Sequence, residues 1–151
     1  MGVYERLQEK GITLPEVGKP VAAFVPWVQT GNLIFTSGSI AKRNEQPWTG
    51  KLGAEVSLED GKRAARQIAV DLLAVLQAAT GDLRKVRRIV KLLVLVNSDA
   101  GFTEQHLVAN GASELLAEIF GEEGAHARSA FGVAQIPFGA CVEIEMIAEI
   151  G

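Results

Sequence analysis

The sequence predicts an α+β fold in which two long helices cover one face of a single sheet, in the order β-β-α-β-α-β-β. Three observations support this class. Apolar side chains recur with helical spacing between Ser57 and Gly81, residues 86–96 form a β-branched apolar run, and two strand-like segments follow near the C-terminus. Because two helices cover only one face of such a sheet, we expect a second subunit to cover the other face. The 151 residues fit one domain over 1–151.

Residues 1–20 are interpreted as an N-terminal extension, in which 3–10 form a short amphipathic helix. β-Favouring residues follow at 21–28 and 33–36. Between these two segments, Thr30-Gly31-Asn32 supplies residues that tolerate a tight reversal of the chain. The first two strands are therefore predicted to form a hairpin.

The first long helix is predicted from its cap and its apolar stripe. The polar stretch 37–56 before it is expected to be a long loop with room for one short extra strand. Ser57 and Asp60 have the three-residue spacing of a capping box, and Gly81 is suited to end the helix. The stripe between them recurs every three to four residues: Ala64, Ala65, Ile68, Leu72, Leu73, Val75, Leu76 and Ala79.

The run VRRIVKLLVLV at 86–96 is apolar on both faces after its basic start, which is typical of an interior strand. A second helix is expected over 103–120. Its apolar stripe consists of Leu107, Leu115, Leu116, Ile119 and Phe120. Asn110-Gly111 is expected to distort or split this helix, because both residues have low helix propensity.

The final strands are predicted at 129–135 and 141–149, with Pro137 and Gly139 between them. Alternation in the last strand points Val142, Ile144, Met146 and Ala148 one way, and Cys141, Glu143, Glu145 and Ile147 the other. A face that mixes apolar and charged groups suggests a subunit interface that contains binding sites. The sequence therefore predicts an oligomer.

Composition narrows the partners of the protein. Hydrophobic residues make up 48% and charged residues 22% of the chain, as in ordinary globular proteins. The net charge of −3 provides no global positive field, so we expect neither nucleic acid nor membrane as a partner. The charged N-terminal segment lacks the apolar core of a signal peptide, which favours a cytoplasmic location. Lone Cys141 and the widely spaced His106 and His126 predict no disulfide and no metal site.

Arg128 opens a run of small and apolar residues, where a buried and unpaired arginine would cost about 3–5 kcal/mol. Two sources of negative charge could pair with Arg128: an internal carboxylate of Glu143, Glu145 or Glu149, or the carboxylate of a substrate. If the final strands formed a simple hairpin, Glu149 would lie opposite Arg128, and Glu143 would lie six residues away, about 20 Å. Arg128 and Glu143 therefore share a site only if these strands pair otherwise, or if they meet across a subunit boundary.

Three motifs resemble those of the YjgF/YER057c/UK114 family, also called the reactive-intermediate deaminase (Rid) family. The segment ARSAFGVAQIPFGACVEIEMIA (127–148) is similar to its closing signature, an Arg-Ser pair, a proline and a Val-Glu-Ile-Glu-x-Ile-Ala strand. TGNLIFTSGSI (30–40) resembles the family's Gly-Asn-Leu-Ile-Phe-x-Ser-Gly-x-Ile strand, and TGKLG (49–53) resembles the loop that follows it. The resemblance covers the chain from about Val21 onward.

The resemblance implies a chorismate-mutase-like fold assembled as a homotrimer, with ligand clefts between subunits. It also implies a hydrolase, a deaminase that converts 2-imino or enamine acids to 2-keto acids and ammonia without a metal or organic cofactor. The family arginine that holds the substrate carboxylate falls on Arg128, and the glutamate that positions water falls on Glu143. The other residues that the resemblance assigns to the cleft are Ser37, Gly38, Ser129 and Ala130.

Two further positions of the expected substrate-binding set depart from the family pattern. A tyrosine in the family's Gly-Pro-Tyr-Ser-Gln segment aligns with Phe24, which lacks the hydroxyl, and an asparagine of its second helix falls near Ser113. These changes resemble a divergent branch. A second function therefore stays open, a non-catalytic protein that binds or senses a small carboxylate such as a keto acid. The family has also been called an endoribonuclease family. The basic residues at 84–88 are expected to be a solvated edge, which lends little support to that activity.

Overall fold

The computed structural model describes residues 1–18 and 23–151, which form an α+β fold. The helices are α1 (Val3–Glu9), α2 (Leu58–Thr80) and α3 (Gln105–Phe120), with the 3-10 turns η1 (Leu83–Lys85), η2 (Gly121–Gly124) and η3 (Pro137–Gly139). The strands are β1 (Trp27–Thr30), β2 (Leu33–Thr36), β3 (Ser39–Ile40), β4 (Lys42–Arg43), β5 (Gln46–Pro47), β6 (Val86–Asn97), β7 (Ala127–Val133) and β8 (Val142–Ile150).

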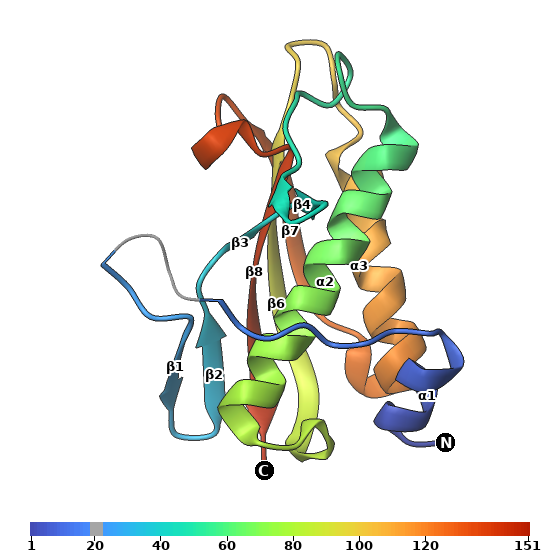
Figure 1. The fold of residues 1–151 in the computed structure, drawn as a ribbon, viewed down its shortest axis with the longest axis vertical. Coiled ribbons are helices and arrows are strands. Elements are labelled where there is room, and N and C mark those ends of the chain that lie inside the picture. Colours follow the sequence, from blue (N-terminus) through green and yellow to red (C-terminus); the bar gives the residue numbers. More distant parts are fainter. Residues whose placement is uncertain (19–22) are drawn as a thin grey trace.

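The main sheet has the strand order β1-β2-β8-β6-β7, and β3 also pairs with β8. Helices α2 and α3 lie side by side over one face of this sheet (Figure 1). The core lies between these two layers, where Ile68, Leu72, Leu92, Leu115 and Ile144 are fully buried. Burying a side chain of this size contributes roughly 1.5–3 kcal/mol. The predicted arrangement of two long helices on one sheet face is confirmed.

Helix α2 begins and ends where its sequence predicts. The Oγ of Ser57 accepts a hydrogen bond from the backbone N–H of Asp60 at 3.2 Å, which satisfies one of the free donors at the helix start. Gly81 adopts the left-handed conformation with φ 77°, and its N–H donates to the carbonyl of Gln77. The cap and the glycine together fix the 23-residue length of the helix.

The expected break in the second helix is wrong, because α3 is continuous through Asn110-Gly111. Gly111 lies where α3 crosses α2, and a Cβ built at this position would be 2.8 Å from the carbonyl carbon of Lys62. No side chain fits in this space. Gly111 therefore lowers helix propensity but permits the close contact of the two helices, and tertiary packing outweighs the local cost.

The N-terminal hairpin forms, although its first strand is shorter than predicted. Strands β1 and β2 pair antiparallel from Trp27 opposite Thr36 to Thr30 opposite Leu33, and Gly31 takes φ 59° in the turn. The prediction began this strand at Val21. Residues 21 and 22 lie outside the described residues, and 23–26 form no strand. Pro26 precedes the strand because it has no N–H to donate to a sheet.

The stretch expected to be a long loop carries β3, β4 and β5. Strand β3 joins the main sheet, whereas β4 and β5 form a separate two-stranded sheet. Asn44 and Glu45 connect them with φ 54° and 64°, as a tight hairpin turn requires. The single predicted sheet is therefore accompanied by a small second one.

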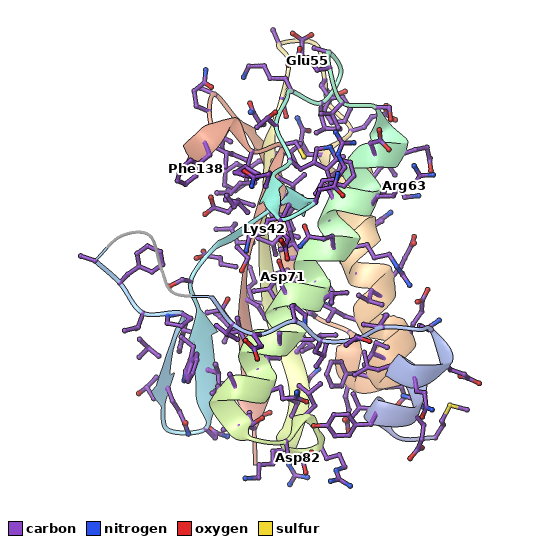
Figure 2. The ribbon with its side chains drawn as sticks, in the orientation of Figure 1. Lys42, Glu55, Arg63, Asp71, Asp82 and Phe138 are labelled. Atoms are coloured by element: carbon purple, nitrogen blue, oxygen red, sulfur yellow. The ribbon has the colours of Figure 1, made fainter. Side chains whose placement is uncertain are left out.

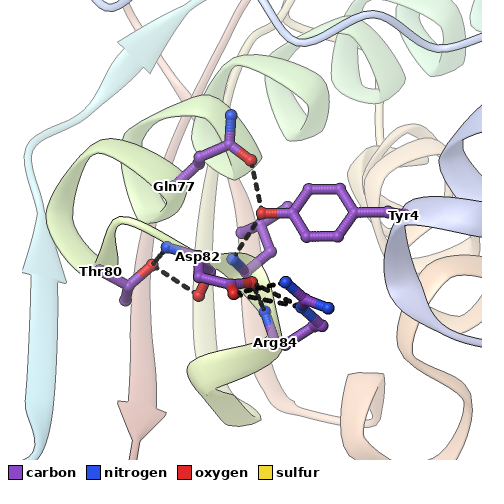
Figure 3. Close-up of polar contacts among 6 residues, drawn as sticks. Tyr4, Gln77, Thr80, Asp82 and Arg84 are labelled. Atoms are coloured by element: carbon purple, nitrogen blue, oxygen red, sulfur yellow. Dashed lines mark hydrogen bonds and ion pairs between the residues drawn. The ribbon is translucent and has the colours of Figure 1, made fainter.

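Helix α1 is fixed to the end of α2 by Tyr4 (Figure 3). The Tyr4 hydroxyl donates to Gln77 Oε1 at 2.8 Å and accepts from the N–H of Leu83 at 2.9 Å. Arg84 lies over the Tyr4 ring, 5.6 Å from its centre, and binds both carboxylate oxygens of Asp82. Hydrogen bonds from Arg84 lower the pKa of Asp82 to about 2. The N-terminal segment is thus part of the folded unit.

The order of the last strands sets the geometry of the candidate site. Strand β8 lies between β2 and β6 and is antiparallel to both, whereas β7 lies at the sheet edge, parallel to β6. The hairpin considered for β7 and β8 therefore does not form. The parallel pairing runs from Lys91 opposite Ala127 to Asn97 opposite Val133. Strand β7 therefore begins and ends two residues earlier than predicted.

The sheet face opposite the helices is open in the described chain. Val28, Phe35 and Phe131 are 55%, 39% and 46% exposed, and cross-strand pairing places all three on this face with Leu93 and Ile147. This set of five apolar residues is called the open face below. Cys141 was expected on this face but precedes β8 and is fully buried, which raises the pKa of its thiol to about 11.

Side chains fill the space between the helices and the sheet, whereas Phe138 projects from η3 away from the sheet (Figure 2). Phe138 is 64% exposed and has φ 63°. Among the described residues, no helix is both long and apolar enough to cross a membrane.

Candidate functional site

Arg128 lies at the edge of the sheet and reaches across to α3. It pairs with Leu92 in β6, so its side chain points to the helix-covered side of the sheet. Its Nη1 donates to Asn110 Oδ1 at 2.8 Å and to Ser113 Oγ at 3.1 Å, and its Nη2 donates to the backbone oxygen of His106 at 3.2 Å. The guanidinium is therefore held at a defined place by one helix.

All three acceptors around Arg128 are neutral. None of the described carboxylates lies within salt-bridge distance of the guanidinium. Glu149, the acid that a hairpin would have placed opposite Arg128, instead accepts from Asn32 Nδ2 at 3.0 Å. The internal salt bridge considered from the sequence is thus absent within the described chain. A half-buried cation held by neutral groups keeps its charge available for an anion.

Ser113 links Arg128 to His126. The Ser113 Oγ lies 2.8 Å from Nε2 of His126, and Nδ1 of the same ring lies 2.6 Å from the backbone oxygen of Gly124. Because a carbonyl oxygen only accepts, Nδ1 carries the proton in the neutral ring, and Nε2 accepts from the Ser113 hydroxyl. The three residues form a chain of hydrogen bonds that ends on the backbone of η2.

Glu143 lies on the opposite side of the sheet from Arg128. It pairs with Ile40 in β3 and with Leu95 in β6, on the same side as Glu145 and the open face. Half-burial raises the pKa of Glu143 above its usual range, and the nearby charge of Glu145 raises it further. A carboxyl group with a raised pKa is suited to accept and return a proton near neutral pH.

Gly38 provides the space that the Glu143 carboxyl group occupies. It follows β2, where the register to β8 shifts between Phe35 opposite Ile147 and Ser39 opposite Ile144. Four steps from Phe35 to Ser39 lie opposite three steps from Ile147 to Ile144, so one residue is extra, as in a β-bulge. A Cβ built on Gly38 would lie 2.9 Å from Cδ of Glu143 and would overlap Oε2.

We expect Gly38→Ala to displace the Glu143 carboxyl group while the protein stays folded, because the end of a flexible side chain moves more easily than backbone. A displacement of about 1 Å lowers kcat by about 10²-fold in a site of this kind. Gly101→Ala is the matched control, since no atom lies within 4 Å of a Cβ there. Equal reaction rates for the two variants would contradict the role of Gly38.

Arg128 and Glu143 do not form one site within a single chain. Arg128 is opposite Leu92 and Glu143 is opposite Leu95, with β6 between their strands. Two strand spacings and three residues along the strand separate their Cα atoms by about 14 Å. Their side chains also point to opposite faces of the sheet. The chain therefore carries two half-sites, the Arg128 half-site and the Glu143 half-site.

Of the other expected residues, some lie at these half-sites and two lie elsewhere. Ser113 contacts Arg128, and Ala130 lies on the same side of β7, whereas Ser129 lies on the side of the open face. The Ser37 hydroxyl donates to the carbonyl of Val25 at 2.6 Å, which ties β2 to the segment before β1. Phe24 belongs to that segment and is 48% exposed. The described contacts bring neither Ser37 nor Phe24 to Arg128 or Glu143.

Sequence reasoning missed two residues of the Arg128 half-site, Asn110 and His126. Asn110 was interpreted as a helix breaker, yet it lies one turn before Ser113 and so shares its helix face. Because the family pattern has an asparagine near Ser113, Asn110 could have been predicted from the sequence as a neighbour of Arg128. His126 carried no signal, because its contact to Ser113 depends on how η2 returns the chain to β7. Among the described residues, no three His, Cys, Asp or Glu side chains gather as metal ligands.

Comparison with known proteins agrees with this architecture. Residues 4–150 match the family described as "YjgF/chorismate_mutase-like, putative endoribonuclease". The chain belongs to the YjgF family. Its fold is accordingly the chorismate mutase-like α+β fold, with a mixed sheet. A TM-score of 0.95 to a "putative endoribonuclease" from Shewanella oneidensis, 29% identical and covering 99% of this chain and 100% of that one, agrees.

Within the YjgF family the chain lies on a divergent branch. It is 47% identical to Protein TCP17 from Trypanosoma cruzi over 98% of this chain and 94% of the relative. It is 45% identical to Atu1372 from Agrobacterium tumefaciens, a protein of unknown function with a crystal structure. The TM-score is 0.90, and the match covers 99% of this chain and 94% of that chain. Identity falls to 28% for a 2-iminobutanoate/2-iminopropanoate deaminase from Dermatophagoides farinae, over 92% and 94%.

A more distant structure of similar fold was solved with a ligand. TdcF from E. coli, with bound serine, shares 24% identity over 90% of this chain and 94% of that chain, with a TM-score of 0.64. This likeness concerns the fold alone.

Proposed function

We propose that this protein hydrolyses reactive 2-imino or enamine acids to 2-keto acids and ammonia, in clefts between the subunits of a homotrimer. The observation that carries the proposal is the Arg128 guanidinium, which is held at a fixed place by neutral groups only. An oriented guanidinium without an internal counter-charge is suited to bind a carboxylate through two parallel hydrogen bonds. The deaminase relative from Dermatophagoides farinae supports the reaction class.

The reaction requires a fixed carbon atom, a water molecule and a route for protons. Arg128 binds the substrate carboxylate and so fixes the adjacent C=N carbon. The Glu143 carboxylate takes a proton from water while the water oxygen bonds to that carbon, and the imine nitrogen takes up a proton. The protonated Glu143 passes its proton to the amine nitrogen and takes the hydroxyl proton as the C–N bond breaks and ammonia leaves. Glu143 then releases one proton to solvent, which replaces the one that the imine nitrogen took up from solvent. One water is consumed, and the 2-keto acid remains on Arg128.

A second subunit completes the proposed site, because the two half-sites of one chain face away from each other. Strand β7 is an edge strand, so the Arg128 half-site lies beside the rim of the sheet. We propose that this rim meets the open face of a neighbouring subunit, where Glu143 offers complementary charge. The exposed Phe35 and Phe131 supply apolar area for such a contact.

Light scattering is expected to give a mass of three times the 16.1 kDa of one chain. Phe35→Asp is expected to dissociate the trimer, since it introduces a charge on the open face. A stable wild-type monomer at micromolar concentration would remove the shared cleft from the proposal.

The activity is tested by generating 2-iminopropanoate in situ and following its decay. The protein is expected to accelerate the decay and to release pyruvate and ammonia in equal amounts. A decay rate equal to that of the buffer alone would contradict the proposal.

The second candidate function is binding or sensing of a keto acid without turnover. Phe24 favours this candidate, because it removes a hydroxyl that the family pattern provides. Calorimetry with 2-ketobutyrate distinguishes the two functions. Equal binding by wild type and Glu143→Ala, with turnover in neither, would favour the sensing protein over the enzyme.

A further inference from the structure

We propose that α3 and His126 orient the Arg128 guanidinium so that a guest carboxylate binds side-on, through Nε and Nη2. In this proposal His126 is a positioning residue that acts through Ser113. The inference rests on the proposed function only in its carboxylate-binding step, which the enzyme and the sensing protein share. It specifies which edge of Arg128 the ligand contacts and which residue outside the cleft controls that edge.

The Arg128 guanidinium has more hydrogen-bond donors than acceptors that contact it. A guanidinium has five N–H groups in a planar fork. The two acceptors at Nη1, Asn110 Oδ1 and Ser113 Oγ, match its two hydrogens, and the His106 oxygen uses one hydrogen of Nη2. No described residue accepts a hydrogen bond from Nε. The donors that remain are Nε–H and one hydrogen of Nη2.

The two remaining donors lie together on one edge of the guanidinium. Positions 106, 110 and 113 lie along one stripe of a helix, so their three acceptors contact the guanidinium from the same side. All three acceptors bind Nη1 or Nη2, and no described acceptor binds Nε. Nε–H and the neighbouring hydrogen of Nη2 form an edge of the guanidinium on which the two N–H groups are parallel. Two parallel donors match the two oxygens of a carboxylate.

His126 controls the direction of the Ser113 hydroxyl hydrogen. A serine inside a helix readily donates its hydroxyl hydrogen to the backbone carbonyl one turn earlier. Here the hydrogen of Ser113 is directed to His126 Nε2 at 2.8 Å, which leaves an oxygen lone pair for Arg128 Nη1. The ring is fixed in turn by its 2.6 Å contact to Gly124. Gly124 packs directly on α3, since a Cβ there would lie 2.8 Å from the carbonyl carbon of Leu116.

Side-on binding through Nε and Nη2 is tested by NMR of arginine Nε–H groups. The Arg128 signal is assigned by its loss in Arg128→Lys. Titration with 2-ketobutyrate is expected to move the Nε–H signal of Arg128 and to leave that of Arg87 unchanged. Binding without any change at Arg128 Nε–H would overturn the side-on geometry while leaving carboxylate binding intact. No binding of 2-ketobutyrate would overturn this inference together with both candidate functions.

The role of His126 is tested with two variants. His126→Leu is expected to raise the Kd for 2-ketobutyrate, and the KM for the imine, about tenfold, with little change in kcat, because Arg128 remains but is less well oriented. His126→Gln is expected to restore most of the affinity, since its amide oxygen offers an acceptor to Ser113. Unchanged affinity in His126→Leu, or equal losses in both variants, would contradict the positioning role. Tight binding without turnover in wild type would support this inference while excluding the enzyme.

Discussion

Replacing Arg128 with alanine is expected to lower kcat/KM for imine hydrolysis by about 10³-fold, which corresponds to about 4 kcal/mol. The expected loss is large because the three hydrogen-bond partners of the Arg128 guanidinium are all neutral groups of α3. Truncating one partner of a charge-assisted, desolvated contact typically costs 2–5 kcal/mol. Initial rates with 2-iminopropanoate generated in situ measure the effect.

Two control variants make this result specific. Arg128→Lys keeps the charge but loses the planar fork, so we expect it to recover only a small part of the activity. Arg87→Ala removes an exposed arginine from β6, away from both half-sites, and we expect wild-type rates. Circular dichroism should show that Arg128→Ala is folded. A folded Arg128→Ala protein as active as wild type would exclude Arg128 as the carboxylate anchor.

Replacing Glu143 with glutamine is expected to lower kcat by about 10²- to 10⁴-fold with little effect on ligand binding, because the amide cannot accept a proton from water. The wild-type rate should rise with pH as Glu143 loses its proton. Burial and the charge of Glu145 raise the pKa of Glu143, so this rise should lie above the usual range for a carboxyl group. Glu143→Gln should abolish this pH dependence.

Glu145→Gln is the matched control, since Glu145 lies two residues away in β8 and is exposed. Removing its negative charge favours the charged form of Glu143 and lowers its pKa. The rising part of the pH–rate profile should therefore move to lower pH, while the maximal rate is retained. A profile that moves to higher pH, or does not move, would contradict Glu143 as the titrating base.

Local patterns predicted the elements whose cause is local. Helix α2 follows from the Ser57 cap, its apolar spacing and Gly81, and β6 follows from an apolar run too long for a loop. The β1–β2 hairpin follows from Gly31, although Pro26 shortened its first strand. The motif that contains Arg128 and Glu143 made both residues candidates for the site, but it gave no information on the direction of their side chains in the folded chain.

Local sequence patterns could not predict contacts between segments that are distant in the chain. Whether β7 pairs with β8 or with β6 depends on the packing of α3, and this choice places Arg128 and Glu143 on opposite faces. Asn110-Gly111 looked like a break because helix propensity is a local quantity, whereas Gly111 serves the contact with α2. The link from Ser113 to His126 depends on the path of η2, which no spacing in the sequence indicates.

The central place of β8 has a consequence for folding kinetics. Strands β2 and β6 are both in the chain long before residues 142–150, yet each pairs with β8 rather than with the other. During synthesis on the ribosome, both strands must remain unpaired along one edge until 142–150 emerge. Pairs so distant in sequence raise the contact order and slow folding. A fragment that ends before residue 142 would therefore expose two unpaired strand edges and aggregate.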